Sequence, residues 1–266
     1  DGRIRVVSFT GSTEVGKILM RDGADSMKRL SLELGGHAPF IVFDDADLDH
    51  AVEQAAAVKM RNMGQTCVSA NRIYVQRGIS AEFSERLVAK LGAMRVGDGL
   101  EPETEVGPLV DGSAVIKVEE HVADAIEKGA EVLLGGRRPE GEARANGHFY
   151  EPTGLRGVDE RMLVANEETF GPVAPIFEFD TEEEVIGKAN NSPYGLAAYF
   201  FTRDVNRVVR VSEALEYGTV GANDGSISAV QAPFGGVKES GIGREGGHWG
   251  LDEYMDIKYI SLAGLA

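Results

Sequence analysis

The sequence predicts an α/β fold, and three observations support this. Short apolar or β-branched runs alternate with stretches of helical apolar spacing along the chain, which is the pattern of an α/β domain. The composition, 42% hydrophobic and 26% charged, is that of an ordinary globular protein with enough apolar residues for a sizeable core. The length of 266 residues allows one large or two modest domains, and no internal repeat is visible.

The first predicted unit is a strand, a turn and a helix over residues 4–24. IRVVSF is β-branched and apolar, TGS interrupts it, and TEVGKILM has helical apolar spacing. A strand that enters a glycine-containing turn at a helix N-terminus offers free backbone N–H groups, which suit a pyrophosphate. The motif FTGSTEVG lacks both the Lys-Ser/Thr of a P-loop and GxGxxG spacing, so an ordinary strand–helix turn is the alternative.

The next strand, RLSLELGG, carries Glu33 among leucines at its carboxyl end. A carboxyl group in an apolar setting has a raised pKa, and a general base that works near neutral pH needs such a pKa. The alternative is a surface-facing residue of a half-buried strand. Glu33 is therefore a candidate general base.

A short strand at 39–43 and a helix that begins after the N-cap residue Asp47 lead to RNMGQTCVSANR at 61–72. This stretch contains Cys67, the only cysteine in the chain. Most lone cysteines are inert core residues, which is the alternative here. The preceding Gly-Gln-Thr suits a tight turn whose free amides stabilise a thiolate, so Cys67 is the candidate nucleophile.

Beyond the cysteine the alternation continues. The patterns predict a strand at RIYVQ, an amphipathic helix at 80–94, a Gly/Pro/Glu-rich loop at 95–112, a helix at 113–128 and a strand at AEVLLGG. The polar segment GGRRPEGEARANG at 135–147 is interpreted as an exposed hairpin. Strands and helices alternate again over 160–224.

The charge and residue counts exclude several classes of protein. A net charge of -16, from 27 basic and 43 acidic residues, disfavours nucleic acid or an anionic membrane surface as a partner. One cysteine excludes an internal disulfide framework and a cysteine-rich metal site, and the five histidines lack ligand spacing, so no metal is expected. With no signal peptide and no apolar run of membrane-spanning length, we expect a soluble, cytoplasmic chain.

Five motifs in this order resemble the NAD(P)-dependent aldehyde dehydrogenase superfamily, and within it the succinate-semialdehyde dehydrogenases. They are FTGSTEVG, LELGG, GQTCVSANR, NEETFGPV (166–173) and PFGGVKESGIGREGG (233–247). The resemblance runs from about residue 4 to the C-terminus. It implies an aldehyde dehydrogenase-like catalytic domain with the last part of a Rossmann-like cofactor domain.

The resemblance implies the chemistry of the two candidate catalytic residues. Cys67 corresponds to the nucleophile that attacks the aldehyde carbon, and its backbone N–H would bind the oxyanion. Glu33 corresponds to the base that activates water for deacylation. Thiolate addition gives a thiohemiacetal, hydride leaves for the nicotinamide, and water hydrolyses the resulting thioester to the acid.

The same resemblance implies binding residues for NAD or NADP and for the substrate. For the cofactor it implies the phosphate-facing turn, a carbonyl for the carboxamide, and groups at the nicotinamide ribose: Gly11, Ser12, Leu34, Glu168 and Phe170. Arg61 and Ser228 fall where a distal substrate carboxylate is held, a task that suits an Arg fork. A solvated helix-end charge and a loop hydroxyl are the alternatives for these two.

Two positions depart from the family pattern. Ser69 stands where many members have a second cysteine, so a local disulfide switch cannot form here. His37 follows LELGG, where Asn or Lys is commoner, and the sequence does not indicate its role.

The resemblance also predicts the domain organisation. Residues 1–36 would end a dinucleotide-binding domain, 37–238 would form the catalytic domain, and 239–266 a return segment. The final strand, YMDIKYISL, would pair with a second subunit in a homodimer or homotetramer. Family members are nearly twice as long, so the chain, which begins at Asp1, is expected to be the C-terminal portion of such an enzyme.

Two functions remain open at this point. One is oxidation of an aldehyde such as succinate semialdehyde, or another short semialdehyde, with NAD or NADP. The other is a catalytically incompetent fragment or assembly module that keeps the fold. Hydrolysis of a thioester or ester by Cys67 and Glu33 without cofactor is a third, minor possibility.

Overall fold

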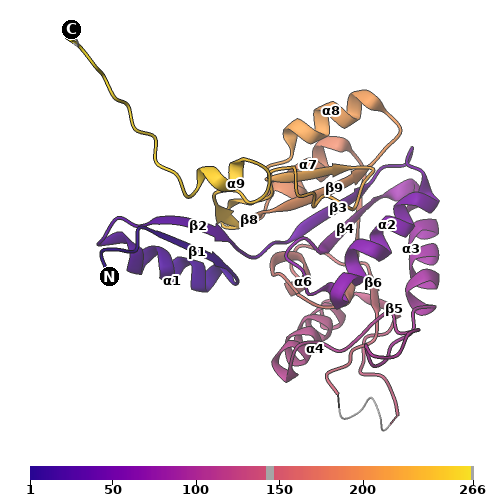
Figure 1. Cartoon of the computed structure of the whole chain (residues 1–266). Coiled ribbons are helices and arrows are strands. Elements are labelled where there is room, and N and C mark those ends of the chain that lie inside the picture. The colour runs from indigo at the N-terminus through magenta and orange to yellow at the C-terminus, as the bar shows by residue number, and fades with distance from the viewer. Residues whose placement is uncertain (142–146, 265–266) are drawn as a thin grey trace.

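The computed structural model describes residues 1–141 and 147–264, and it confirms the predicted α/β fold (Figure 1). Its main feature is a seven-stranded sheet in which only the pair at the β5 edge is antiparallel. The strand order is β10 (Thr219–Ala222), β9 (Ala197–Phe201), β3 (Ala38–Val42), β4 (Ala70–Gln76), β7 (Val173–Phe179), β6 (Thr153–Arg156) and β5 (Glu131–Leu134).

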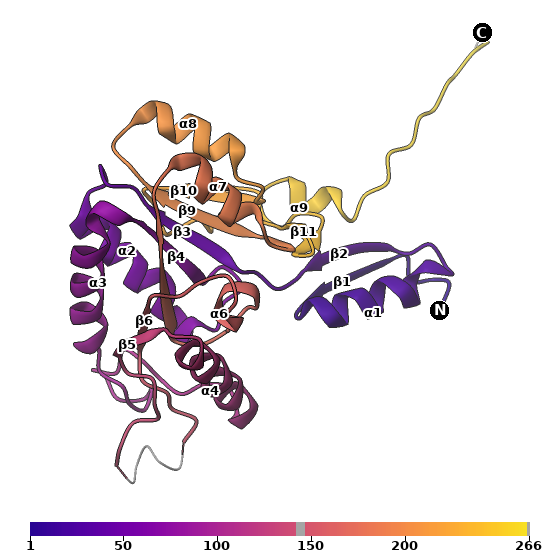
Figure 2. The same ribbon diagram turned by 180° about the vertical axis from the view of Figure 1, so that it is seen from behind.

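Helices cover both faces of this sheet (Figures 1 and 2). One apolar cluster takes in α2 (Leu48–Met60) and α3 (Arg77–Gly92). The other takes in α4 (Gly112–Glu127), α6 (Leu163–Asn166), α7 (Glu182–Asn190) and α8 (Val205–Ala214). Along β3, Phe40 and Val42 belong to the first cluster and Ile41 to the second, because successive side chains of a strand point to opposite faces. Burial on both faces explains why this strand is continuously apolar.

The predicted helix start at Asp47 is confirmed. Its carboxylate accepts a hydrogen bond from the backbone N–H of His50 at 3.2 Å. A side-chain oxygen at this position satisfies one of the backbone donors that the first turn leaves free. Because α2 starts there, its last turn ends at the segment that carries Cys67.

The strand–turn–helix unit predicted for 4–24 forms a separate arm beside the large sheet (Figures 1 and 2). It comprises β1 (Val6–Thr10) and α1 (Thr13–Ala24), and it is followed by β2 (Arg29–Glu33), which lies parallel to β1. The third strand of this small sheet is β12 (Gly241–Ile242), which pairs antiparallel with the end of β2. A segment from the far end of the chain therefore fixes the backbone at Glu33.

The C-terminal part contains short elements and a final segment without regular structure. β8 (Tyr194–Gly195) pairs with β11 (Val237–Lys238), and α9 (Trp249–Asp252) follows. The strand at 254–262 was predicted to pair with a second subunit, which the single chain does not test: the structure assigns no strand there, and the segment runs away from the body (Figure 1). A strand needs a hydrogen-bonded neighbour, and this segment pairs with no part of the chain that the structure describes.

The hairpin predicted for 135–147 is only partly visible, because residues 142–146 lie outside the described residues. Within the described ranges, none of the helices is both long enough and apolar enough to cross a membrane.

The turn before Cys67 has an unusual backbone. In the short 3-10 segment Arg61–Gly64, Asn62 and Met63 have φ of 50° and 57°, and Gly64 has φ of 74°. A Cβ on Gly64 would lie 2.1 Å from the carbonyl oxygen of Gly171. Glycine is needed here for its backbone conformation and for the close approach of another segment.

Gly64→Ala should therefore destabilise the protein by more than about 2 kcal/mol, since both the positive φ and the contact with Gly171 oppose a side chain. The matched control is Gly78→Ala at the start of α3, where a Cβ would meet nothing within 4 Å. The control should be neutral or stabilising by about 0.5 kcal/mol. Urea unfolding of the two variants measures the difference, and equal midpoints would contradict this account.

Candidate active site

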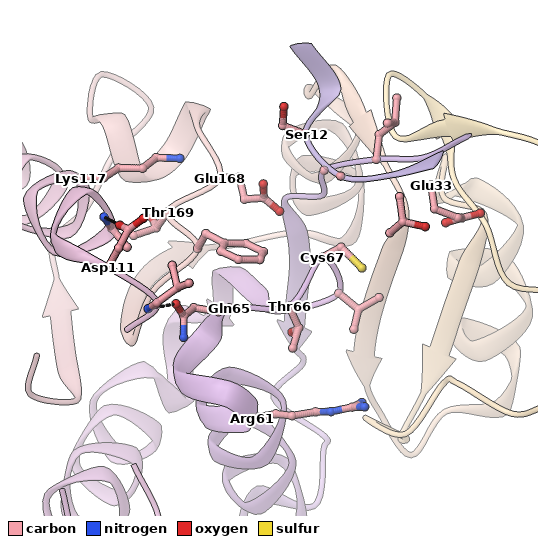
Figure 3. Close-up of a pocket in the computed structure, with 18 of the residues that line it drawn as sticks. Ser12, Glu33, Arg61, Gln65, Thr66, Cys67, Asp111, Lys117, Glu168 and Thr169 are labelled. Atoms are coloured by element: carbon pink, nitrogen blue, oxygen red, sulfur yellow. Dashed lines mark hydrogen bonds between the residues drawn. The ribbon is translucent and has the colours of Figure 1, made fainter. Parts of the chain in front are cut away.

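A cavity of about 750 Å³ lies between the small and the large sheet, within the roughly 300–1,000 Å³ typical of ligand sites. Every residue for which the sequence analysis predicted a site role lines it: Gly11, Ser12, Glu33, Leu34, Arg61, Cys67, Glu168, Phe170 and Ser228. In Figure 3, Cys67 lies between Glu33 and Glu168, with Ser12 and Arg61 toward opposite ends.

The position of the cavity follows from the strand directions. The turn with Gly11 follows β1, and Glu33 ends β2, so both lie at the carboxyl edge of the small sheet. Cys67 precedes β4 and Glu168 precedes β7, and these two parallel neighbours begin at the same edge of the large sheet. Parallel strands have their like ends at one edge, so residues distant in sequence face one another across the cavity.

A close backbone approach joins the three segments that carry Glu33, Cys67 and Glu168. A Cβ on Gly36 would lie 2.1 Å from the carbonyl oxygen of Cys67, so only glycine fits. The N–H of Gly36 donates to Glu168 Oε1 at 3.0 Å. From the other side, the hydroxyl of Tyr199 donates to the carbonyl oxygen of Val68 at 2.9 Å.

Glu33 has the properties expected of a general base. Its side chain is 5% exposed, and Oε2 has no hydrogen-bond partner among the described residues. Burial raises its pKa to about 8, the negative charge of Glu245 adds to the rise, and Arg244 opposes it. The sequence-based expectation of a raised pKa is thus confirmed in direction and cause.

The Cys67 thiol differs from the expectation of a stabilised thiolate. Burial raises its pKa to about 11, and the nearby carboxylates of Glu168 and Glu33 add to the rise. The backbone N–H groups of Cys67 and Val68 act in the opposite direction, as a tight turn should, but they do not outweigh burial. Within this chain alone the thiol is therefore protonated at neutral pH.

Glu168 is a buried carboxyl whose pKa is raised to about 7, mainly by burial; the Gly36 N–H and the charges of Lys117 and Lys59 oppose the rise. Lys59 was not predicted from the sequence. It is fully buried, its Nζ donates to Asn71 Oδ1 at 2.8 Å, and burial lowers its pKa to about 7. In the sequence Lys59 looks like any exposed lysine on a helix, so nothing there indicated that it is buried.

Two cations face the cavity. Arg61 and Lys117 both line it, and neither forms an ion pair within 4.0 Å with the described carboxylates. Lys117 was missed by the sequence analysis, because only the packing of α4 brings its first turns to the cavity wall (Figure 3). Other lining residues, to whose side chains the sequence analysis gave no role, include Gln65, Thr66, Asp111, Ser113 and Thr169.

The residues present fit part of a dinucleotide, namely a phosphate and a ribose. Ser12 is the N-cap of α1 and accepts from the Val15 N–H at 3.4 Å, which leaves other first-turn N–H groups of the helix to face an anion. Glu168 binds Gly36 through Oε1 only, and its Oε2 lies 3.0 Å from where a Cβ on Gly35 would stand. A carboxylate with a free oxygen suits ribose hydroxyls.

Comparison with known proteins gives a consistent picture. The family model described as "Aldehyde dehydrogenase family" matches residues 1–260. A probable succinate-semialdehyde dehydrogenase [NADP(+)] from Sinorhizobium fredii is 54% identical over 99% of this chain. A glutarate-semialdehyde dehydrogenase from Pseudomonas putida is 56% identical over 98% of it. The crystal structure of succinate-semialdehyde dehydrogenase from Burkholderia pseudomallei superimposes with a TM-score of 0.95 at 54% identity over 98% of the chain.

The chain spans about half the length of the relatives it matches: 53% of both curated proteins and 53% of the crystallised chain.

Alkylation of Cys67 by iodoacetamide should be slow at pH 7–8 and should rise steeply above pH 10, because only the thiolate reacts and its pKa is about 11. Glu33→Gln should lower the pH of half-maximal rate, since it removes a negative charge that disfavours the thiolate. Glu213→Gln, at an exposed carboxylate on α8, is the control and should not shift it. A half-maximal rate near pH 7 in the unmodified chain would contradict this description.

Proposed function

The chain belongs to the aldehyde dehydrogenase family, as its motifs predicted, and from this premise we propose that it carries the catalytic residues for NAD- or NADP-dependent oxidation of a short anionic semialdehyde to the acid. Succinate semialdehyde is the substrate we favour. The observation that carries the proposal is that one cavity collects a thiol, a buried carboxyl with raised pKa, an Arg without an ion-pair partner among the described residues, and a helix N-terminus.

The proposed chemistry begins with Cys67. Its sulfur adds to the aldehyde carbon, and its thiol proton passes to Glu33 or to solvent. The Cys67 backbone N–H, one of the groups that lower the thiol pKa, would donate to the oxygen that becomes negative in this step. When bound in the cavity, the oxidised nicotinamide cofactor supplies the hydride acceptor.

Glu33 completes the reaction by taking a proton from the water that attacks the Cys67 thioester. With a pKa near 8, Glu33 is a stronger base than an ordinary carboxylate, yet it is partly ionised at neutral pH. Its Oε2, which has no hydrogen-bond partner in the part of the chain that the structure describes, can accept the hydrogen bond from that water.

Recognition of the distal acid group is proposed for Arg61 and Ser228. Support comes from the Arg61 guanidinium, which lacks an ion-pair partner among the described residues although acidic residues outnumber basic ones by 43 to 27. Relatives of nearly equal identity are named for succinate and for glutarate semialdehyde, so both are candidate substrates. These differ by one methylene, which a hydrophobic pocket discriminates by only about 1–3 kcal/mol.

The organisation of the chain is also a proposal. Residues 1–36 would end the cofactor domain, 37–238 would form the catalytic domain, and 239–266 would return to the cofactor domain, as the pairing of β12 with β2 favours. The exposed side chains of Ile257, Tyr259 and Leu262 support pairing of 254–262 with a second copy in a homo-oligomer. The single, free cysteine suits a reducing compartment such as the cytoplasm.

In the full-length gene product, kcat for aldehyde oxidation should rise with pH and level off above about pH 8, because deacylation needs ionised Glu33 and its pKa is about 8. Glu33→Gln should remove this limb and slow steady turnover about a hundredfold to ten-thousandfold while leaving a burst of reduced cofactor. Stopped-flow absorbance separates the two phases. If burst and steady rates fell together, Glu33 would not be the deacylation base.

Arg61→Ala should lower kcat/KM for succinate semialdehyde by roughly ten- to a hundredfold, since a charge-assisted hydrogen bond contributes about 1.5–3 kcal/mol. Ser228→Ala should have a smaller effect of the same kind, because in a hydrogen bond from a serine hydroxyl to a carboxylate only the acceptor is charged. The matched control is an uncharged aldehyde of similar length, which both variants should oxidise nearly as well as the unmodified enzyme. Equal losses for both substrates would assign these residues a structural role.

A further inference from the structure

The segment from Ala165 to Phe170, which carries Glu168, is held by a buried histidine on each of two other segments. His37, 1% exposed, lies just beyond the Gly35-Gly36 pair that follows Glu33. Its Nε2 is 2.9 Å from the carbonyl oxygen of Ala165. A carbonyl only accepts, so Nε2 carries the proton and donates.

The second histidine, His121, reaches the segment from α4 and is 2% exposed. Its Nδ1 lies 3.1 Å from Thr169 Oγ1, and its Nε2 faces Glu167 Oε2 at 3.6 Å. These are the two residues that flank Glu168 in sequence. His121 therefore contacts the chain on both sides of the carboxyl that faces the cavity.

The segment needs such support because its own backbone gives little. Phe170 has φ of 54°, a left-handed conformation that costs a non-glycine residue about 1–3 kcal/mol. The helix before it, α6, has only four residues. The Glu168 carboxylate itself accepts one backbone hydrogen bond, from Gly36.

His37 is itself fixed from behind. Its carbonyl oxygen accepts from the buried Arg72 Nε at 3.1 Å, and Arg72 also donates to the carbonyl oxygens of Lys188 and Ala189. The histidine thus connects the 165–170 segment to the strand that follows Cys67. His37 is therefore not in contact with the reacting atoms, yet it is linked through hydrogen bonds to both the Glu168 segment and the Cys67 segment.

We propose that His121 and His37 are positioning residues that hold the 165–170 segment so that the Glu168 carboxylate stays beside Gly36 and faces the cavity. This proposal depends on the proposed function in one respect only, which is the assignment of Glu168 as a cofactor contact. Both imidazoles act in the neutral form: burial is the main cause that lowers each pKa, helped by Arg72 and Lys59 at His37 and by Lys117 at His121, where Glu167 and Asp124 oppose.

Cys67 reports the position of Glu168 without any cofactor, because the Glu168 charge is one cause of the raised thiol pKa. His121→Leu should let the segment move, take the carboxylate toward solvent, and lower the pH of half-maximal Cys67 alkylation by roughly half a unit to one unit. Thr169→Val, which removes the partner and keeps the shape, should give a shift of the same sign. The double variant should shift no further than the larger single one.

Two further variants separate positioning from general loss of packing. Val122→Ala, a buried neighbour of His121 on the same helix, should lower the melting temperature and leave the alkylation profile unchanged. His121→Gln, which retains an acceptor for Thr169, should keep most of the unmodified profile. If folded His121→Leu and Thr169→Val both alkylate with the unmodified profile, the proposal is overturned.

The second arm uses the full-length gene product. His121→Leu should raise the KM for the nicotinamide cofactor about tenfold or more with a smaller change in kcat, the loss expected for one hydrogen bond to a carboxylate. If the unmodified enzyme shows no cofactor-dependent aldehyde oxidation, the proposed function fails while the alkylation arm still decides the positioning role. A shifted thiol profile with an unchanged cofactor KM would support the positioning role and overturn the assignment of Glu168 to the cofactor.

Discussion

The site depends on two places where one backbone lies directly against another, with glycine as the only residue that fits. Gly36 abuts the Cys67 carbonyl, and Gly64 abuts the Gly171 carbonyl, each at a distance of 2.1 Å from where a Cβ would be. Together they bring the ends of three segments, those of Glu33, Cys67 and Glu168, to one point. The Gly36 N–H then reaches Glu168 Oε1, which would be impossible if a side chain held the two segments apart.

Burial at this point sets the ionisation of the whole site. The same loss of hydration raises the pKa of Glu33, Glu168 and Cys67 and lowers that of Lys59. Neutral forms are favoured, so the chain keeps a stronger base and a protonated thiol in one cavity. The buried Glu33 also lowers the stability of the folded protein. Its folded pKa exceeds its unfolded pKa, so the free energy of unfolding falls as pH rises from about 4.5 toward about 8.

The cavity forms where the carboxyl edge of the small sheet faces the edge at which β4 and β7 of the large sheet begin. The carboxyl edge of the small sheet contributes an anion-suited turn and the base, and the starting edge of the large sheet contributes the thiol and Glu168. The β12 strand, from the far end of the chain, pairs with β2 at Leu32 and Glu33 and so fixes the backbone of Glu33. Each sheet alone would hold only some of these groups, and their meeting explains why residues at positions 11, 33, 67, 168 and 228 line a single space.

The sequence by itself determined the local features: the strand and helix order, the Asp47 cap, the turn before Cys67 and the identity of the candidate nucleophile and base. These follow from residue periodicity and short motifs, which act over a few neighbours. Tertiary structure decided the rest. The thiol pKa, the inward-facing Lys59 and Lys117, and the contacts of His121 and His37 all depend on which segments pack together and exclude water. The segment at 254–262 has the pattern of a strand but is not one here, because backbone pairing needs a neighbour that its own sequence cannot supply.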